Sequence, residues 1–168
     1  MKKVLKLSII SLLLFSFLVP YTAFAKADEA NLEWQDIELS EEEFNAILEN
    51  NPDDGISAYT SGLILTYRIA ISKSGTNNLV IAGKTSCTSE VVKCGFSTIT
   101  VQRRANSSSS WSKVVSYDDL YSNSFGYTLS KTITVTRGYQ YRVTCTHYAK
   151  KSFLSTEKIN NTSNTVTF

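Results

Sequence analysis

The sequence has few residues that carry metal, redox or acid–base chemistry: its 168 residues include one His, one Met and three Cys. Its two Pro and seven Gly exclude collagen-like and proline-rich architectures. Beyond the N-terminal segment it has no apolar run of about 18 residues, the length that a membrane span needs. No catalytic or nucleic-acid-binding motif occurs. We therefore expect a non-enzymatic protein with no cofactor, no metal, no nucleic-acid partner and no membrane span in its mature form.

The first feature that is present is an export signal. It consists of a basic start, an apolar run too short for a bilayer and a small-x-small ending: Lys2, Lys3 and Lys6, then residues 5–19, then Ala23-Phe24-Ala25. This order is typical of a secretory signal peptide. We expect residues 1–25 to be removed between Ala25 and Lys26, and the mature protein to be secreted and extracellular.

Charge divides the mature chain into two parts. Residues 26–58 carry 11 acids and one Lys, whereas residues 59–168 carry 13 bases and four acids. The small formal net charge of +2 therefore conceals an acidic arm followed by a basic domain. Hydrophobic residues make up 42% of the chain, enough for one buried core.

The acidic arm contains one helix signal, over residues 41–49. Ser40 and Glu43 have the spacing of a capping box, and Leu39 and Phe44 have that of a hydrophobic staple. A helix of about nine residues is marginal alone and must dock to persist. Two interpretations stay open for the arm: a solvated acidic spacer, or a pro-segment that lies on the basic domain until it is cut away.

After the arm, the sequence becomes typical of β-strands. In residues 63–71, for example, the alternation predicts one inward face: Leu63, Leu65, Tyr67, Ile69 and Ile71. Strands are predicted at residues 63–71, 79–85, 96–104, 111–117, 127–136, 139–148 and 162–168. Short alternating strands with frequent turn signals favour an all-β, antiparallel sandwich of about seven strands over residues 59–168.

The segment from Gly138 to Cys145 resembles the sixth strand of fibronectin type III and immunoglobulin-like modules. In both, a Tyr-x-Val pattern starts an inward stripe, here at Tyr141. The segment departs from true immunoglobulin domains because Val143 stands two residues before Cys145, where those domains have the Tyr of a tyrosine corner.

A second resemblance is to a family of small uncharacterised secreted proteins of Gram-positive bacteria. The shared residues are Val101-Gln102-Arg103 with the following Trp111, and the run 138–143 with the following His147. This likeness implies export and an immunoglobulin-like (fibronectin III-like) sandwich, and it implies no activity.

The three cysteines leave at least one unpaired. A disulfide between Cys87 and Cys94 would clamp the turn between two predicted strands. A disulfide between Cys87 and Cys145 would instead imitate the bridge between sheets of immunoglobulin folds, and both pairings stay open. These cysteines with His147 are zinc-type ligands, but Cys145-x-His147 on one strand is not a usual chelating pair. We interpret His147 as a packed side chain.

The aromatic residues from Trp111 to Tyr127 have two open interpretations, which are packing in the core or at a sheet edge, and a binding patch. The predicted binding patch combines aromatic and basic residues: Tyr121, Phe125, Tyr127, Arg103, Arg104, Lys150 and Lys151. Outward threonines such as Thr98, Thr100, Thr144 and Thr146 are interpreted as solvent-facing strand positions. We expect a non-catalytic binding protein of the cell envelope, whose partner is an anionic wall polymer or a surface protein. The alternative is a secreted effector or toxin-like protein that the acidic arm masks.

Overall fold

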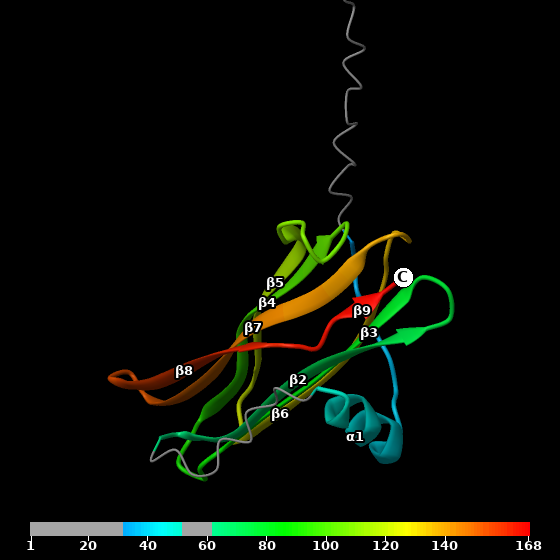
Figure 1. The fold of residues 1–168 in the computed structure, drawn as a ribbon. Coiled ribbons are helices and arrows are strands. Elements are labelled where there is room, and N and C mark those ends of the chain that lie inside the picture. The colour runs from blue at the N-terminus through cyan, green and yellow to red at the C-terminus, as the bar shows by residue number, and fades with distance from the viewer. Residues whose placement is uncertain (1–31, 52–61) are drawn as a thin grey trace, which may run out of the picture.

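A computed structural model describes residues 32–51 and 62–168, which form a β-sandwich of two antiparallel sheets with one short helix (Figure 1). The predicted signal peptide, its cleavage point and residues 26–31 and 52–58 of the arm lie outside the described residues. The elements, in chain order, are β1 (Gln35–Asp36), α1 (Glu41–Glu49), β2 (Ile64–Ser74), β3 (Asn78–Cys87), β4 (Lys93–Arg104), β5 (Ser112–Ser122), β6 (Gly126–Thr134), β7 (Gln140–Ser152), β8 (Ser155–Thr162) and β9 (Val166–Thr167).

The strands divide between two sheets. Sheet 1 has the order β1-β6-β3-β2, and sheet 2 has the order β5-β4-β7-β8, with β9 also paired to β7. Every pairing among the described strands is antiparallel. The predicted all-β antiparallel sandwich is therefore confirmed.

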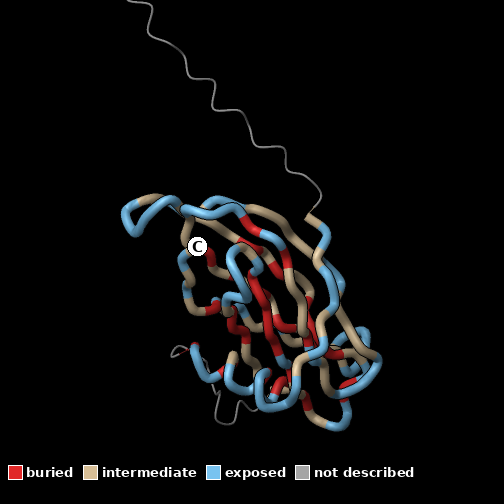
Figure 2. Tube along the Cα trace, turned by 90° about the vertical axis from the view of Figure 1, so that its right-hand side faces the viewer, coloured by how far each residue is buried: buried red, intermediate tan, exposed pale blue. Residues whose placement is uncertain are grey.

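The core consists of inward side chains from both sheets, and Figure 2 shows the buried residues as red segments in the interior of the molecule. Along β7 the burial alternates at every residue from Tyr141 to Ala149, as a strand with one wet face requires. The Tyr141 hydroxyl donates a hydrogen bond of 2.7 Å to the Thr136 carbonyl. This bond ties the start of β7 to the chain just before it, and it is made four residues before Cys145 rather than two.

The prediction for the start of β2 was wrong at Leu65. This side chain is exposed, while its neighbour Ile64 is fully buried. The pairing of β2 with β3 shifts register between Ile64 and Thr66, and such a bulge reverses the inward face. Further along, Ile69 and Ile71 face the core as predicted, whereas Ala70 between them packs under α1.

The C-terminal strand assignment also needs correction. Residues 162–168 were predicted as one strand, but Thr162 is the last residue of β8 and Val166–Thr167 forms a separate strand, β9. The main partner of β7 on that side is β8, Ser155–Thr162. Its sequence STEKINNT is polar, so it carries no strong strand signal, and it is held by pairing with β7 at the sheet edge.

Helix α1 covers the outer face of sheet 1. Its capping box forms as predicted, with the Ser40 side chain accepting from the Glu43 backbone N–H. Phe44 and Leu48 are buried against Ala70 of β2 and Ala82 of β3, which lie opposite each other in register. Two small side chains on this face leave room for the helix to approach the sheet. The sandwich therefore has a third layer on one side only.

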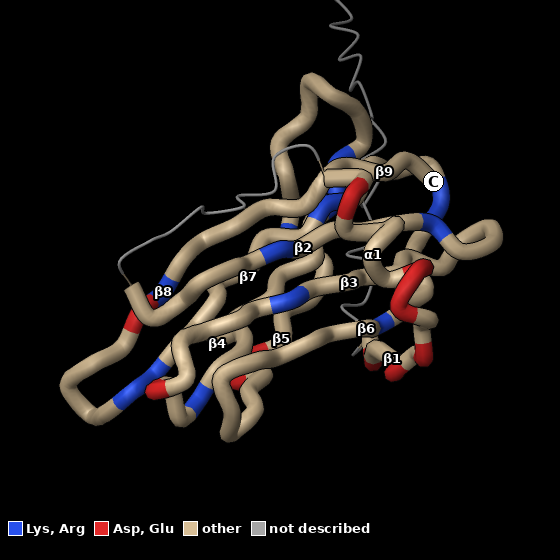
Figure 3. The backbone as a smooth tube through the Cα atoms, turned by 90° about the horizontal axis from the view of Figure 1, so that it is seen from below, with Lys and Arg blue, Asp and Glu red and all other residues tan. Residues whose placement is uncertain are grey.

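The rest of the described arm is also attached to the sandwich. The Trp34 ring stacks on Tyr117, with centroids 3.6 Å apart. Asp36 in β1 forms an ion pair with Lys131 of β6. Figure 3 shows the acidic segments of α1 and β1 beside basic segments of β2, β3 and β6. Residues 32–51 are thus a docked part of the fold, and the solvated-spacer interpretation is wrong for them.

The free edge of β2 is capped by polar side chains instead of another strand. The Glu157 carboxylate of β8 accepts hydrogen bonds from the backbone N–H groups of Leu63 and Ile64. The Asn164 amide bonds to both backbone groups of Ile71, at 2.8 and 2.9 Å. Satisfied edge groups protect a sheet from pairing with other chains, and these contacts also join the two sheets along one side.

We predict that Leu48→Ala lowers the free energy of unfolding by about 3 kcal/mol, because it removes a fully buried side chain and leaves a cavity under α1. Chemical denaturation would measure the change. Glu42→Ala, at an exposed position of the same helix, should change stability by under about 0.5 kcal/mol. Equal stability of the two variants would mean that α1 does not depend on this contact.

Candidate functional site

The outer face of sheet 2 is the candidate site. No described helix or strand covers it. The pairing of β5, β4, β7 and β8 brings its outward side chains into rows across the sheet. From the β7–β8 turn outward the rows are Tyr121–Gly95–Tyr148–Lys158, then Asp118–Thr98–Thr146–Asn160, then Ser116–Thr100–Thr144–Thr162, then Lys113–Gln102–Arg142.

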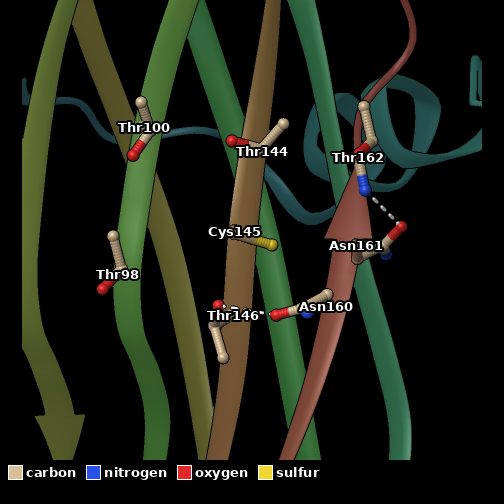
Figure 4. Close-up of a pocket in the computed structure, with 8 residues that line it drawn as sticks. All are labelled: Thr98, Thr100, Thr144, Cys145, Thr146, Asn160, Asn161 and Thr162. Carbon is tan, nitrogen blue, oxygen red and sulfur yellow. Dashed lines mark hydrogen bonds between the residues drawn. The ribbon is translucent and has the colours of Figure 1, made fainter. Parts of the chain in front are cut away.

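The two middle rows form a shallow groove of about 330 Å³ (Figure 4). Its walls are hydroxyl and amide side chains, and its lining residues are Thr98, Thr100, Thr144, Cys145, Thr146, Asn160, Asn161 and Thr162. Thr146 donates a hydrogen bond of 2.8 Å to the Asn160 side chain. The Asn161 Nδ2 atom is buried and has no hydrogen-bond partner among the described residues. Such a lining offers both donors and acceptors to a polar ligand.

A cation–aromatic cluster lies at the end of the face away from the β7–β8 turn. The Trp111 ring is contacted by the guanidinium groups of Arg104 and Arg142, each 4.4 Å from a ring centroid. Gln140 and Gln102 accept hydrogen bonds of 2.8 Å from Arg104 and Arg142, respectively. Burial, and then the nearby charge of Arg104, lower the pKa of Arg142. Two like charges are therefore held side by side in fixed positions.

A second cation–aromatic cluster lies at the other end of the groove. The Tyr121 and Tyr148 rings have centroids 4.9 Å apart, and Lys93 Nζ is 4.2 Å from the Tyr121 centroid. Gly95 separates the two tyrosines in the sheet and has a φ of 154°. A Cβ there would lie 2.1 Å from the Leu120 carbonyl oxygen. Only glycine fits at this position, and its missing side chain lets the rings meet.

The structure does not gather the predicted binding patch into one place. Arg103 and Arg104 end β4, about 33 Å by strand rise from Lys150 and Lys151 at the end of β7. The Tyr127 ring packs edge-on against the buried Phe96, so it belongs to the core.

The other predicted residues belong to separate surroundings. Tyr121 lies on the outer face, and Phe125 is exposed in the loop between β5 and β6. Arg103 lies over Tyr139, 4.7 Å from the ring centroid, while Arg104 contacts Trp111. Sequence reasoning did not place Trp111, Arg142 or Lys93 in the site. The outward threonines of β4 and β7 are at even-numbered positions, and Arg142 is also at an even-numbered position of β7. This alternation is the sequence signal that places Arg142 on the same face as the threonines.

The cysteines form a close pair and a separate thiol. Cys87 Sγ and Cys94 Sγ are 2.8 Å apart as free thiols, and both are buried. The hydrogen bond between them and burial raise the pKa of Cys87, and the same hydrogen bond lowers the pKa of Cys94. Cys145 contacts His147 instead, with Sγ 3.4 Å from Nε2. The geometry favours the Cys87–Cys94 pairing over Cys87–Cys145.

His147 is enclosed in the core. Its Nδ1 atom shares a hydrogen bond of 2.7 Å with Thr85 Oγ1, and its ring contacts Phe96 and Tyr67. Burial lowers the pKa of His147 to about 3. A neutral imidazole without solvent exposure cannot exchange protons with a substrate at the surface. The described residues contain no group of three or more His, Cys, Asp or Glu side chains placed to hold a metal ion.

The comparisons with known proteins add no assignment: no protein-family model, no curated protein and no solved structure matches the chain. Within residues 32–51 and 62–168, no helix has the length and apolar character to cross a membrane. The interpretation of the site therefore rests on its own geometry.

We predict that refolding in oxidised glutathione links Cys87 to Cys94. The Cys94 thiolate would attack the glutathione disulfide and release one glutathione, and Cys87 would then displace the second. Closing this loop of eight residues should raise the free energy of unfolding by about 2.5 kcal/mol. Peptide mapping without reduction would locate the bond. A Cys87–Cys145 peptide, or three free thiols, would contradict the prediction.

We predict that the stability of the fold decreases in acid partly through His147. The unfolded chain takes up a proton near pH 6.5, whereas the folded chain does so only near pH 3. Between these values the unfolded state binds more protons, so the free energy of unfolding falls by up to about 1.4 kcal/mol per pH unit from this group. Since His147 is the only histidine, its ring proton NMR signal reports the pKa directly. A native titration near pH 6.5 would disprove the assignment.

Proposed function

We propose that the protein is a secreted, non-catalytic binding protein of the cell envelope that holds an anionic polymer along the outer face of sheet 2. The observation that carries this proposal is the groove of threonine and asparagine side chains with a cation–aromatic cluster at each end. The hydroxyl and amide groups suit polyol or sugar units, and the lysine and arginine groups suit phosphate or carboxylate groups.

The charge on this face supports an anionic ligand. Its cationic side chains are Lys93, Arg104, Lys113, Arg142, Lys150 and Lys158, whereas its acids, Asp118 and Asp119, both lie on the edge strand β5. The two cation–aromatic clusters flank the groove along the strand direction, so a long chain that lies along β7 would contact both. Aromatic rings that are already held by cations lose little freedom when a ligand stacks on them.

We further propose that the sandwich is immunoglobulin-like, of the fibronectin type III kind. The strand order supports this, because β2, β3 and β6 form one sheet while β4, β5, β7 and β8 form the other. The hydrogen bond from Tyr141 to the Thr136 carbonyl supports it too, because a tyrosine corner makes the same kind of bond at the start of the equivalent strand.

The alternative, an effector masked by its acidic arm, finds less support. The helix of the described arm lies on the outer face of sheet 1, where Arg68 donates a hydrogen bond of 2.9 Å to the Leu48 carbonyl, and Trp34 stacks on Tyr117 of the edge strand β5. The outer face of sheet 1 is opposite the groove. Residues 32–51 therefore leave the candidate site uncovered. Their side chains Phe44 and Leu48 are buried in the folded protein, as expected for a permanent part of the structure.

We predict that the protein binds purified cell walls through their phosphodiester-linked anionic polymer. Cosedimentation should be strong with intact walls and weak after the polymer has been removed chemically. Raising the salt concentration should weaken binding, because exposed charges are then screened. The double variant Arg104→Gln and Arg142→Gln should lower affinity about three- to tenfold.

Lys84→Gln is the matched control, because Lys84 is exposed on the outer side of sheet 1. It removes a positive charge without touching the groove, so its binding should equal that of the natural sequence. Equal binding to intact and stripped walls would refute the proposed ligand. Retention on a wall-bound protein that a protease removes would favour a surface protein as partner.

A further inference from the structure

One end of the sandwich holds all of the exposed large hydrophobic side chains of the described residues. These are Leu65 (42% exposed), Val92 (57%), Phe125 (59%), Phe153 (88%) and Leu154 (90%). They come from the start of β2 and from the loops β3–β4, β5–β6 and β7–β8, which the sheet pairing brings to the same end. Exposed apolar side chains gathered in this way mark an interaction surface.

The β7–β8 turn is the most prominent part of this end. In Figure 1 this hairpin extends beyond the neighbouring strands. Ser152 pairs with Ser155, so Phe153 and Leu154 alone form the turn. Two-residue turns favour Gly, Asn and Asp. Phe and Leu are thus not required by the turn, and burial in the core does not explain them either.

Lysines surround the apolar tip. Lys93 and Lys150 lie directly opposite each other on β4 and β7, and like charges in this position repel. Lys151 pairs with Glu90, while Lys150 has no carboxylate partner among the described residues. An anionic group outside the protein would relieve the repulsion between the two facing lysines.

We propose that this end of the sandwich docks on an anionic lipid bilayer, with Phe153 and Leu154 inserted at the interface and the adjacent lysines at the headgroups. A protruding tip with two adjacent apolar residues suits a fluid surface, into which it can penetrate, better than the matching pocket of a folded partner. Apolar insertion combined with basic residues is the usual basis of binding in the interface. The proposal goes beyond the polymer-binding function and does not depend on it.

The test is cosedimentation of the purified full chain with vesicles of phosphatidylglycerol and phosphatidylcholine. We expect binding that decreases at high salt and that is at least tenfold weaker with phosphatidylcholine alone. The double variant Phe153→Ser and Leu154→Ser should lower binding at least tenfold without changing the melting temperature, because both side chains are exposed. Absence of binding to anionic vesicles, or equal binding to both vesicle types, would overturn the proposal.

Charge reversal at a half-buried lysine and at an exposed arginine gives a comparison between the two ends of the sandwich. Lys150→Glu lies at the tip, and Arg137→Glu lies in the β6–β7 loop at the opposite end. Only the first should weaken vesicle binding, by about three- to tenfold, and equal effects of the two would contradict a located site. In the variant Phe153→Trp, brominated lipid should quench the fluorescence of the tryptophan at the tip. Absence of quenching would show that the tip does not insert.

Two further outcomes separate this proposal from its competitors. A dimer that the two serine substitutions abolish, without vesicle binding, would identify a second copy as the occupant and overturn the proposal. The same serine variant should still bind intact cell walls. If the natural sequence binds vesicles but not walls, the polymer-binding function fails and the bilayer proposal stands.

Discussion

The contact between α1 and the alanine pair of sheet 1 determines which surface of the molecule is available. Ala70 and Ala82 are opposite each other, and their small side chains let Phe44 and Leu48 reach the sheet. With the outer face of sheet 1 covered, sheet 2 presents the broad uncovered strand face of the described residues. Glu41 of α1 and Lys84 line one pocket, and Asp36 of β1 pairs with Lys131, so acidic residues of the arm lie beside basic residues of sheet 1.

Much of the fold was predictable because strands such as β7 alternate regularly between inward and outward residues. The helix was predictable because its cap is local, with Ser40 and Glu43 three residues apart. Its docking was not, because the receiving alanines lie on two strands and become neighbours only through pairing. The reversed face at Leu65 depends on a bulge, and β8 depends on its neighbour β7; neither is encoded in the local sequence alone.

The candidate site was predictable in part. Alternation placed Thr98 and Thr146 outward correctly, and the structure shows them opposite each other on β4 and β7. Strand pairing then decides which outward residues meet, and this separated Arg104 from Lys150 although both are basic and outward. The cluster around Tyr121 arises from β4, β5 and β7, and the cluster around Trp111 arises from β4, β7 and the residue just before β5. Their composition was visible in the sequence, but their assembly requires the register of sheet 2.

The two proposed surfaces share Lys93 and Lys150 at one end of the groove, and the rest of the groove extends away from the tip. The groove row at Thr146 lies six residues along β7 from Ser152, which corresponds to about 20 Å of strand. A molecule held at a bilayer by its Phe153–Leu154 tip would therefore carry the groove well clear of the headgroups, on a rigid sheet rather than on a loop. Because the tip is apolar and the groove is polar, the contact of the tip with lipid resists salt more than the contact of the groove with polymer does. If increasing salt releases the polymer before the lipid, the tip anchors the protein and the groove holds a ligand. The reverse order would make the groove the anchor.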